Sequence, residues 1–197
     1  GKSSVLNEIT QRFINEGYPI IKTREPGGTD IAEQIRNVIL DKQNVKLDPR
    51  AEALLYAASR RQHLVEKIWP ALKEGKIIFC DRYLDSSLAY QGGARHLGVQ
   101  EVLNVNSFAT ENTFPNLTIL FDITPELGLE RIAKNANREV NRLDLEKLDF
   151  HHNVRNTFLS LAKKYSDRYV VVDASQPYDV VVNEVYNIIK QRLTNGN

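Results

Sequence analysis

Several residue types that would define a class of protein are scarce in this sequence. Methionine is absent, and Cys80 is the only cysteine, so no disulfide can form within the chain. No apolar run approaches the roughly 20 residues that a membrane-spanning helix needs. No signal peptide is recognisable, so we expect a protein of the cytoplasm that has no membrane partner.

Net charge is nearly absent as well. The chain has 26 Lys and Arg against 25 Asp and Glu, which leaves a formal charge of +1. No global field favours nucleic acid, so we expect no nucleic-acid partner. The 197 residues suffice for one compact domain, and no repeat, low-complexity tract or linker divides them. We therefore expect a single domain over residues 1–197.

Short apolar runs alternate with amphipathic segments along the chain. We expect strands at 19–22, 77–80, 117–122 and 169–173. We expect helices at 3–16, 31–40, 48–73, 100–111, 125–136, 143–164 and 176–193. This β–α alternation predicts an α/β fold, a doubly wound parallel sheet with flanking helices.

Helical periodicity also predicts which side chains face the core. The apolar stripes of these helices place the following large residues inward: Ile31, Ile35, Val38, Ile39, Leu54, Val65, Leu72, Phe108 and Leu148. Cys80 is expected to pack in a buried strand.

The stretch KIIFCDRYLDSSLAYQGG at 76–93 combines a strand with charged and polar residues. Asp81 and Arg82 directly follow the apolar run, and ligands of parallel α/β sheets bind at this edge. Asp85, Ser86, Ser87, Tyr90 and Gln91 then follow at spacings typical of one helix face, with Gly92-Gly93 closing the segment. An acid and a guanidinium can hold a metal-bound phosphate and a bare phosphate. The alternative is an ordinary ion pair and a capped helix.

The chain begins with GKSS, which matches the end of a P-loop. In that motif backbone N–H groups cradle phosphates, the lysine reaches the β/γ oxygens and the hydroxyl binds Mg²⁺. Gly1, Lys2 and Ser3 would be its last positions, so we expect the first strand of a P-loop NTPase-like fold to be absent from the sequence. The match is short, and an ordinary N-terminus is the alternative.

Longer motifs resemble bacterial thymidylate kinases. They are TREPGG at 23–28, EALLYAASRRQHL at 52–64, DRYLDSSLAYQGG at 81–93, PNLTILFDITPELGLERI at 115–132, NRLD at 141–144 and DASQP at 173–177. The resemblance covers nearly the whole chain in order. It implies a P-loop kinase, commonly a homodimer, that phosphorylates dTMP to dTDP with ATP and Mg²⁺.

The resemblance also implies roles for individual residues. ATP binding falls to Gly1, Lys2, Ser3, Ser4, Arg138 and Gln176, and metal binding to Ser3, Glu25 and Asp81. Catalysis falls to Lys2, Arg82, Arg138 and Arg142. Residues 134–142 would form a lid, and the polar composition KNANREVNR agrees with a mobile or solvated segment. Arg142 has an alternative role, as an anchor of the helix that follows it.

The implied dTMP site takes residues from several segments. They are Arg24, Pro26, Arg36, Tyr56, Arg60, Arg82, Ser86, Ser87, Tyr90 and Gln91. Arginines would hold the phosphate in two-point contact. Tyr56 stands where family members often have Phe, and would stack on thymine. Tyr90 would crowd the 2′ position of the sugar.

Two other functions remain open at this point. One is a kinase for another pyrimidine nucleoside monophosphate, because dUMP differs from dTMP by one methyl, worth only about 1–3 kcal/mol in an apolar pocket. The other is a nucleotide-binding module without catalysis. ADP formation that depends on added dTMP would separate the kinase from the module.

Overall fold

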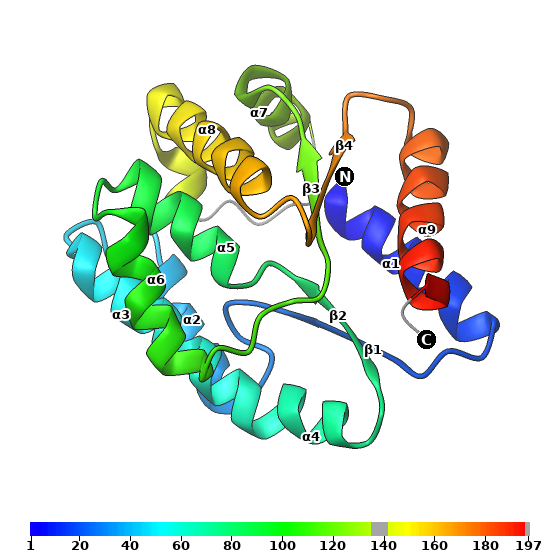
Figure 1. Cartoon of the computed structure of the whole chain (residues 1–197). Coiled ribbons are helices and arrows are strands. Elements are labelled where there is room, and N and C mark those ends of the chain that lie inside the picture. The colour runs from blue at the N-terminus through cyan, green and yellow to red at the C-terminus, as the bar shows by residue number, and fades with distance from the viewer. Residues whose placement is uncertain (135–141, 196–197) are drawn as a thin grey trace.

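The computed structural model describes residues 1–134 and 142–195 as an α/β structure (Figure 1). The strands are β1 (Ile20–Arg24), β2 (Ile77–Asp81), β3 (Thr118–Asp122) and β4 (Tyr169–Asp173). The α-helices are α1 (Lys2–Asn15), α2 (Asp30–Leu40), α3 (Pro49–His63), α4 (Trp69–Lys73), α5 (Leu84–Ser87), α6 (Val99–Thr110), α7 (Pro125–Ala133), α8 (Leu148–Lys164) and α9 (Tyr178–Asn195). Two π-helical segments, η1 (Leu64–Ile68) and η2 (Leu88–Ala94), and a 3₁₀ helix, η3 (Arg142–Leu145), complete the described elements.

The four described strands form two parallel pairs. β1 pairs with β2 from Ile20 opposite Ile77 to Arg24 opposite Asp81. β3 pairs with β4 from Thr118 opposite Tyr169 to Asp122 opposite Asp173. Polar residues therefore end each pair at the carboxyl edge, where parallel sheets place their ligands.

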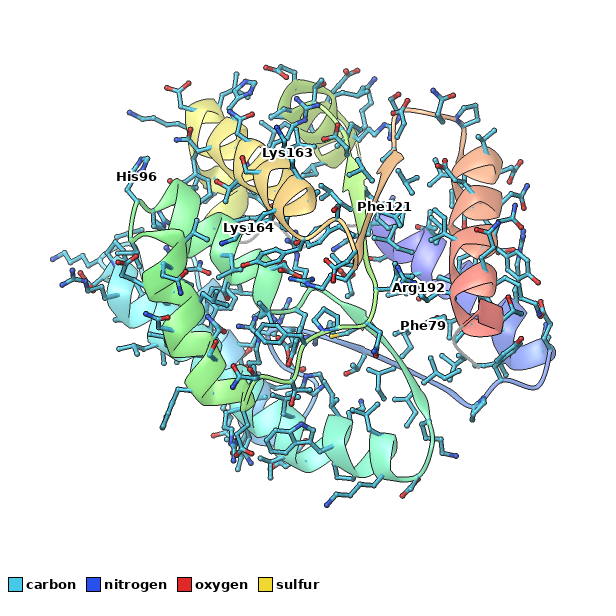
Figure 2. All side chains as sticks on the ribbon, in the orientation of Figure 1. Phe79, His96, Phe121, Lys163, Lys164 and Arg192 are labelled. Atoms are coloured by element: carbon cyan, nitrogen blue, oxygen red, sulfur yellow. The ribbon has the colours of Figure 1, made fainter. Side chains whose placement is uncertain are left out.

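One hydrophobic core joins the two pairs. Its buried residues come from α1, β4 and α9: Val5, Ile9, Phe13, Val172, Val181, Val182 and Val185. Phe79 of β2 and Phe121 of β3 pack against this cluster from different sheets, and Figure 2 shows both on the side of α1 and α9. A second core forms around Leu84, Leu88 and Leu161, where α5, η2 and α8 meet. Helices thus lie on two sides of the strands, as Figure 1 shows.

A cavity of about 2020 Å³ separates β2 from β3. Every residue of both strands lines it, together with Gly1 and Lys2 at the start of α1. Cys80 is half-buried for this reason, whereas the sequence predicted a buried strand around it. No described helix is both long and apolar enough to cross a membrane.

The segment expected to be one helix over residues 48–73 is divided. Asp48 caps α3 by accepting hydrogen bonds from the N–H groups of Arg50 and Ala51. The π-helical turn η1 lies between α3 and α4, and Pro70 occupies the first turn of α4, where a missing N–H has no cost. The expected closure at Gly92-Gly93 is also wrong, because η2 runs through both glycines to Ala94. A Cβ on Gly92 would lie 2.9 Å from the Val99 Cα, so close packing explains this glycine.

Several apolar side chains expected in the core are exposed instead. They are Ile31 (48%), Val38 (46%), Leu54 (57%), Val65 (45%), Leu72 (45%), Phe108 (89%) and Leu148 (41%). Ile39 is fully buried, as expected, while the adjacent Val38 on α2 is not. Periodicity predicts an apolar face but not what covers it, and in these helices part of that face meets solvent.

Candidate active site

The start of α1 and the end of β2 meet at the carboxyl edge of the β1–β2 pair. Ser3 Oγ donates to Asp81 Oδ2 at 3.1 Å, and the Lys2 ammonium forms an ion pair with Asp81 Oδ1. Asp81 reaches this point because it is the last residue of β2, opposite Arg24 of β1. The sequence-predicted lysine, hydroxyl and carboxylate are therefore in direct contact.

Burial and neighbouring charges shift the pKa values of both Lys2 and Asp81. Burial and, after it, the charge of Arg82 lower the pKa of Lys2 from 10.5 to about 8, against the attraction of Asp81. Burial raises the pKa of Asp81, but the Lys2 and Arg82 charges and the Ser3 hydroxyl outweigh this and lower it overall. Asp81 is thus held as an anion beside a lysine that gives up its proton more readily than usual.

Other residues predicted to bind ATP line the same cavity. Gly1, Lys2, Ser3 and Ser4 surround the N-terminus of α1, whose N–H groups and dipole favour an anion. Gln176 lies across from them in the turn after β4, with its Nε2 donating to Asp173 Oδ2 at 2.8 Å. Arg131 of α7 donates to the Ala174 and Ser175 carbonyls and so holds this turn.

The loop after β1 brings two predicted arginines together. Arg24 Nη1 and Arg36 Nη1 donate to the Pro26 carbonyl at 2.8 and 3.0 Å. Gly28 has a φ of +95°, and a Cβ there would lie 2.7 Å from His63 Nε2, so only glycine fits this tight approach. The Pro26 carbonyl of the TREPGG loop thus brings together Arg24, from the end of β1, and Arg36, from α2.

Glu25 takes a position different from the expected metal set. Its carboxylate is 3% exposed and accepts from Arg60 Nε at 2.7 Å and from His63 Nδ1 at 3.0 Å. The Thr23 hydroxyl lies 2.7 Å from the other His63 nitrogen. Both oxygens of Glu25 are therefore used inside the protein, which favours a role in orienting Arg60.

Arg82 lies on the ring of Tyr90. The guanidinium carbon is 5.2 Å from the ring centroid, and Arg82 has a φ of +70°, a backbone region that few non-glycine residues adopt. The Cys80 thiol donates to the Arg82 carbonyl at 3.0 Å. The unusual backbone turns the Arg82 side chain from the strand end toward the helical segment that carries Tyr90.

A polar face of α3 meets a polar face of α5 and η2. Arg60 Nη1 donates to Ser87 Oγ at 3.1 Å, and Gln91 Nε2 donates to Glu52 Oε1 at 2.7 Å. Tyr56 lies one turn from both Glu52 and Arg60, and burial raises the pKa of its phenol. Ser86, the remaining predicted dTMP residue here, lines the large cavity beside Tyr90.

Sequence reasoning missed three buried partners of these residues. Glu52 and His63 are fully buried on α3, and Asn106 of α6 accepts a hydrogen bond from Arg60 Nη1. Glu52, Tyr56, Arg60 and His63 follow a spacing of four, four and three residues, which places them on one helix face. This spacing can be read from the sequence, and it indicates a polar face of α3 that includes Glu52 and His63.

Of the two predicted lid arginines, only Arg142 lies among the described residues. Arg138 lies outside the described residues. Arg142 is buried, its Nε donates to the Ile39 carbonyl at 3.2 Å, and its Nη2 pairs with Glu52. These contacts join Arg142 to α2 and α3, and not to α8, the helix for which the sequence had suggested an anchor.

Comparison with known proteins gives one consistent result. The family model described as "Thymidylate kinase" matches residues 1–185. A Thymidylate kinase of Geobacillus sp. (strain WCH70) is 55% identical over 181 residues, covering 92% of this chain and 86% of that protein. Those of Bacillus velezensis and Clostridium novyi are each 53% identical, over 98% and 96% of this chain and 91% and 93% of theirs. The chain belongs to the thymidylate kinase family.

Proposed function

We propose that this protein phosphorylates dTMP to dTDP with MgATP, and that the transfer takes place beside Asp81 and Arg82. The observation that carries the proposal is the adjacency of two groups. Lys2 and Ser3 converge on Asp81, and the next residue, Arg82, lies on the ring of Tyr90 in η2. A donor phosphate and an acceptor phosphate held by neighbouring residues can meet in line.

The chemistry needs positioning and charge more than it needs covalent help. Phosphoryl transfer passes through a transition state that spreads charge over the transferred oxygens, so cations and oriented N–H groups lower its energy. Lys2 and the α1 N-terminus would hold the ATP phosphates, and Arg82, Arg36 and Arg24 would hold the acceptor. The acceptor phosphate is already ionised near neutral pH, so no general base is required.

The oxygen donors beside Lys2 fit Mg²⁺. Mg²⁺ prefers one or two carboxylates, waters and substrate phosphates, and Asp81 and Ser3 present a carboxylate and a hydroxyl 3.1 Å apart. Bound Mg²⁺ would neutralise charge on the ATP phosphates. Lys2, now paired with Asp81, would then turn to a phosphate oxygen. We assign Glu25 to Arg60 rather than to the metal, because both of its oxygens are already used.

The thymine base would bind where α3 meets α5 and η2. Tyr56 would stack on the ring, Arg60 would donate to a carbonyl, and Ser87 and Gln91 would reach the base edge. Pro26 and Tyr90 would border the sugar. Support comes from the Arg60–Ser87 bond, which joins two predicted base contacts from different elements.

A further parallel strand fits the cavity between β2 and β3. Within residues 1–134 and 142–195 each of these strands is paired on one side only, and the cavity runs along all their residues. A strand there would merge the two pairs into one doubly wound sheet and would end beside Gly1. A chain that carries such a strand ahead of Gly1 should unfold at higher urea than residues 1–197. Equal midpoints would contradict this.

Exposed apolar side chains support a homodimer. α3 packs between α2 and α6, and these helices expose Val38, Leu54 and Phe108, while η1, directly after α3, exposes Val65. We propose that a second copy covers this surface, because an exposed patch of this kind usually marks an interface. Phe108→Glu should shift the sedimenting species from dimer to monomer. A wild-type monomer at micromolar concentration would refute the proposal.

The decisive experiment is ADP release across nucleoside monophosphates. We expect ADP formation with dTMP, weaker formation with dUMP, and only background without an acceptor. Arg82→Ala should lower kcat/KM for dTMP by the equivalent of about 2–5 kcal/mol, because a charged phosphate loses its buried partner. Arg61→Ala, which breaks a surface pair with Glu111, serves as the control. Unchanged kinetics in Arg82→Ala would overturn the acceptor assignment.

A further inference from the structure

His63 of α3 is fully buried, and both of its ring nitrogens contact the segment that leaves β1. Its Nδ1 lies 3.0 Å from Glu25 Oε1, and its Nε2 lies 2.7 Å from the Thr23 hydroxyl oxygen. Nδ1 donates, because the Glu25 carboxylate, which also pairs with Arg60, only accepts hydrogen bonds. The hydroxyl at Nε2 can donate or accept. The imidazole therefore holds two residues of this segment from a single point on α3.

The backbone of the same loop, residues 23–28, packs against this ring. A Cβ on Gly28 would lie 2.7 Å from His63 Nε2 and 2.8 Å from its Cδ2, so a glycine lets the loop close over the imidazole. One turn earlier on α3, Ser59 Oγ accepts a hydrogen bond from the Gly27 N–H at 3.1 Å. The loop is thus held on α3 from its first residue to its last.

The residue between the two held side chains points the other way. Thr23 and Glu25 are 7% and 3% exposed, whereas Arg24 between them is exposed, as the alternation of an extended chain requires. By holding the inner face of this segment, His63 fixes the direction in which Arg24 leaves the backbone.

The Pro26 carbonyl connects this loop to two proposed phosphate ligands. Arg24 Nη1 donates to it at 2.8 Å, and Arg36 Nη1 of α2 donates to it at 3.0 Å. A guanidinium held in place before the ligand arrives binds phosphate better, because less side-chain freedom is lost on binding. The position of this one carbonyl therefore sets where both cations lie.

We propose that His63 is a positioning residue for the acceptor phosphate: it locks the loop after β1 and thereby holds Arg24 and Arg36 in place. The inference rests on the proposed role of these arginines in binding the phosphate of dTMP. It gives a fully buried ring on α3 an effect on the phosphate end of the nucleotide.

Thr23→Val tests the proposal with a change that conserves shape, whereas replacing His63 itself leaves a cavity. The valine leaves His63 Nε2 buried without a partner, so the ring and the loop can shift. We expect KM for dTMP to rise about tenfold and KM for ATP to change less than about twofold, since a displacement of about 1 Å can cost as much as 10²-fold. Thr23→Ser retains the hydroxyl and should recover most of the loss. An unchanged KM for dTMP in Thr23→Val would overturn the inference.

Thr10→Val is the matched control. Thr10 is 8% exposed, and its hydroxyl donates to the Leu6 carbonyl at 2.6 Å within α1. The same substitution thus removes a buried hydroxyl from another element. A protein that is only destabilised has fewer active molecules, which lowers the apparent kcat at constant KM. Equal rises of KM for dTMP in Thr10→Val and Thr23→Val would show that general stability sets KM, and would overturn the inference.

His63→Asn is the second variant, for the case in which Thr23→Val does not fold. The Asn amide nitrogen can replace Nδ1 at Glu25, but its shorter side chain loses the contact with Thr23. KM for dTMP should rise as in Thr23→Val, and the double variant should show little further rise, because both changes break the same contact. Additive rises, or a normal KM in His63→Asn, would overturn the inference.

Binding of thymidine, which lacks the phosphate, separates the two ends of the nucleotide. A loosened Glu25 has a second route to the ligand, through its pair with Arg60, a proposed base contact. In calorimetry we expect Thr23→Val to weaken binding of dTMP about tenfold and that of thymidine less than about twofold. Equal weakening of both ligands would place the effect at the base and overturn the inference.

Arg36→Ala separates this inference from the proposed function. If Arg36→Ala raises KM for dTMP while Thr23→Val does not, the acceptor site stands and the role of His63 is overturned. If Arg36→Ala leaves KM for dTMP unchanged, the proposed placement of the acceptor phosphate fails, and the inference falls with it.

Discussion

Glu25 and Arg60 form a buried ion pair, with Arg60 Nε 2.7 Å from Glu25 Oε2 and both side chains 2% exposed. The pair joins the loop after β1 to the middle of α3, and Arg60 continues to Ser87 on α5 and Asn106 on α6. Four elements around the proposed base pocket are thus linked through one guanidinium group. Burial makes this link costly to break, because a lone charge would remain in a protein interior.

Glu25→Gln should therefore destabilise the protein strongly. The change leaves the Arg60 charge without its anion, and we expect a loss of about 3–5 kcal/mol in the free energy of unfolding. Urea denaturation measures this loss. Glu8→Gln, which breaks an exposed pair with Arg12, should cost less than about 1 kcal/mol. Similar losses in the two variants would show that Glu25 is not an essential counter-ion.

Tyr90→Ala should relax the selection of deoxyribose. The ring packs near Phe150, with 6.0 Å between centroids, and beneath Arg82, so its position is well supported. Removing it opens space for a 2′-hydroxyl and should raise activity on ribonucleotides relative to dTMP. Tyr90→Phe retains the ring and should keep the wild-type ratio. An unchanged ratio in Tyr90→Ala would place the discrimination elsewhere.

MgATP binding should weaken as the pH rises through about 8. The folded-state pKa of Lys2 lies near 8, so above this pH the free protein loses the ammonium that would hold the ATP phosphates. Asp81, Arg82 and Cys80 are the other titratable groups that face it. Lys2→Arg stays charged and should lack this pH dependence. Equilibrium binding of ATP across this range measures both proteins, and parallel curves would refute the role of Lys2.

Folding stability should show the opposite trend in the ligand-free protein. A pKa lowered from 10.5 to about 8 means that the proton on Lys2 disfavours the folded state below pH 8. This cost is relieved between pH 8 and 10.5, so the Lys2 contribution to stability rises there. The urea midpoint of the wild type should therefore rise relative to that of Lys2→Arg over this window.

The two lid arginines should behave differently when replaced. Arg142→Ala removes one of the two guanidinium partners of the buried Glu52, leaving Arg95, and should cost up to about 3–5 kcal/mol of stability. Arg138→Ala should lower turnover at least a hundredfold, since an arginine supplied to a phosphoryl group is worth roughly 10³–10⁵ in rate. Normal turnover in Arg138→Ala would show that the charged segment has no catalytic role.

The amino-acid sequence by itself determined the local elements of this protein. Apolar runs of about five residues between amphipathic segments predicted all four described strands and most helices, because period and length are local properties. The predicted site residues of the TREPGG and DRYLDSSLAYQGG motifs also make contacts in the structure. Arg24 and Arg36 meet at Pro26, and Arg82 meets Tyr90.

Tertiary structure alone decided what covers each face and which charges pair. Phe108 satisfies the helical period of α6 as well as Val102 does, yet one is 89% exposed and the other 3%. Glu25 and Glu52 could be metal ligands, surface acids or counter-ions from sequence. Only the packing of α3 against the loop after β1 and against η2 buries them beside arginines. The physical reason is that a charge has a partner only through contacts between segments far apart in the chain, and no local pattern encodes that distance.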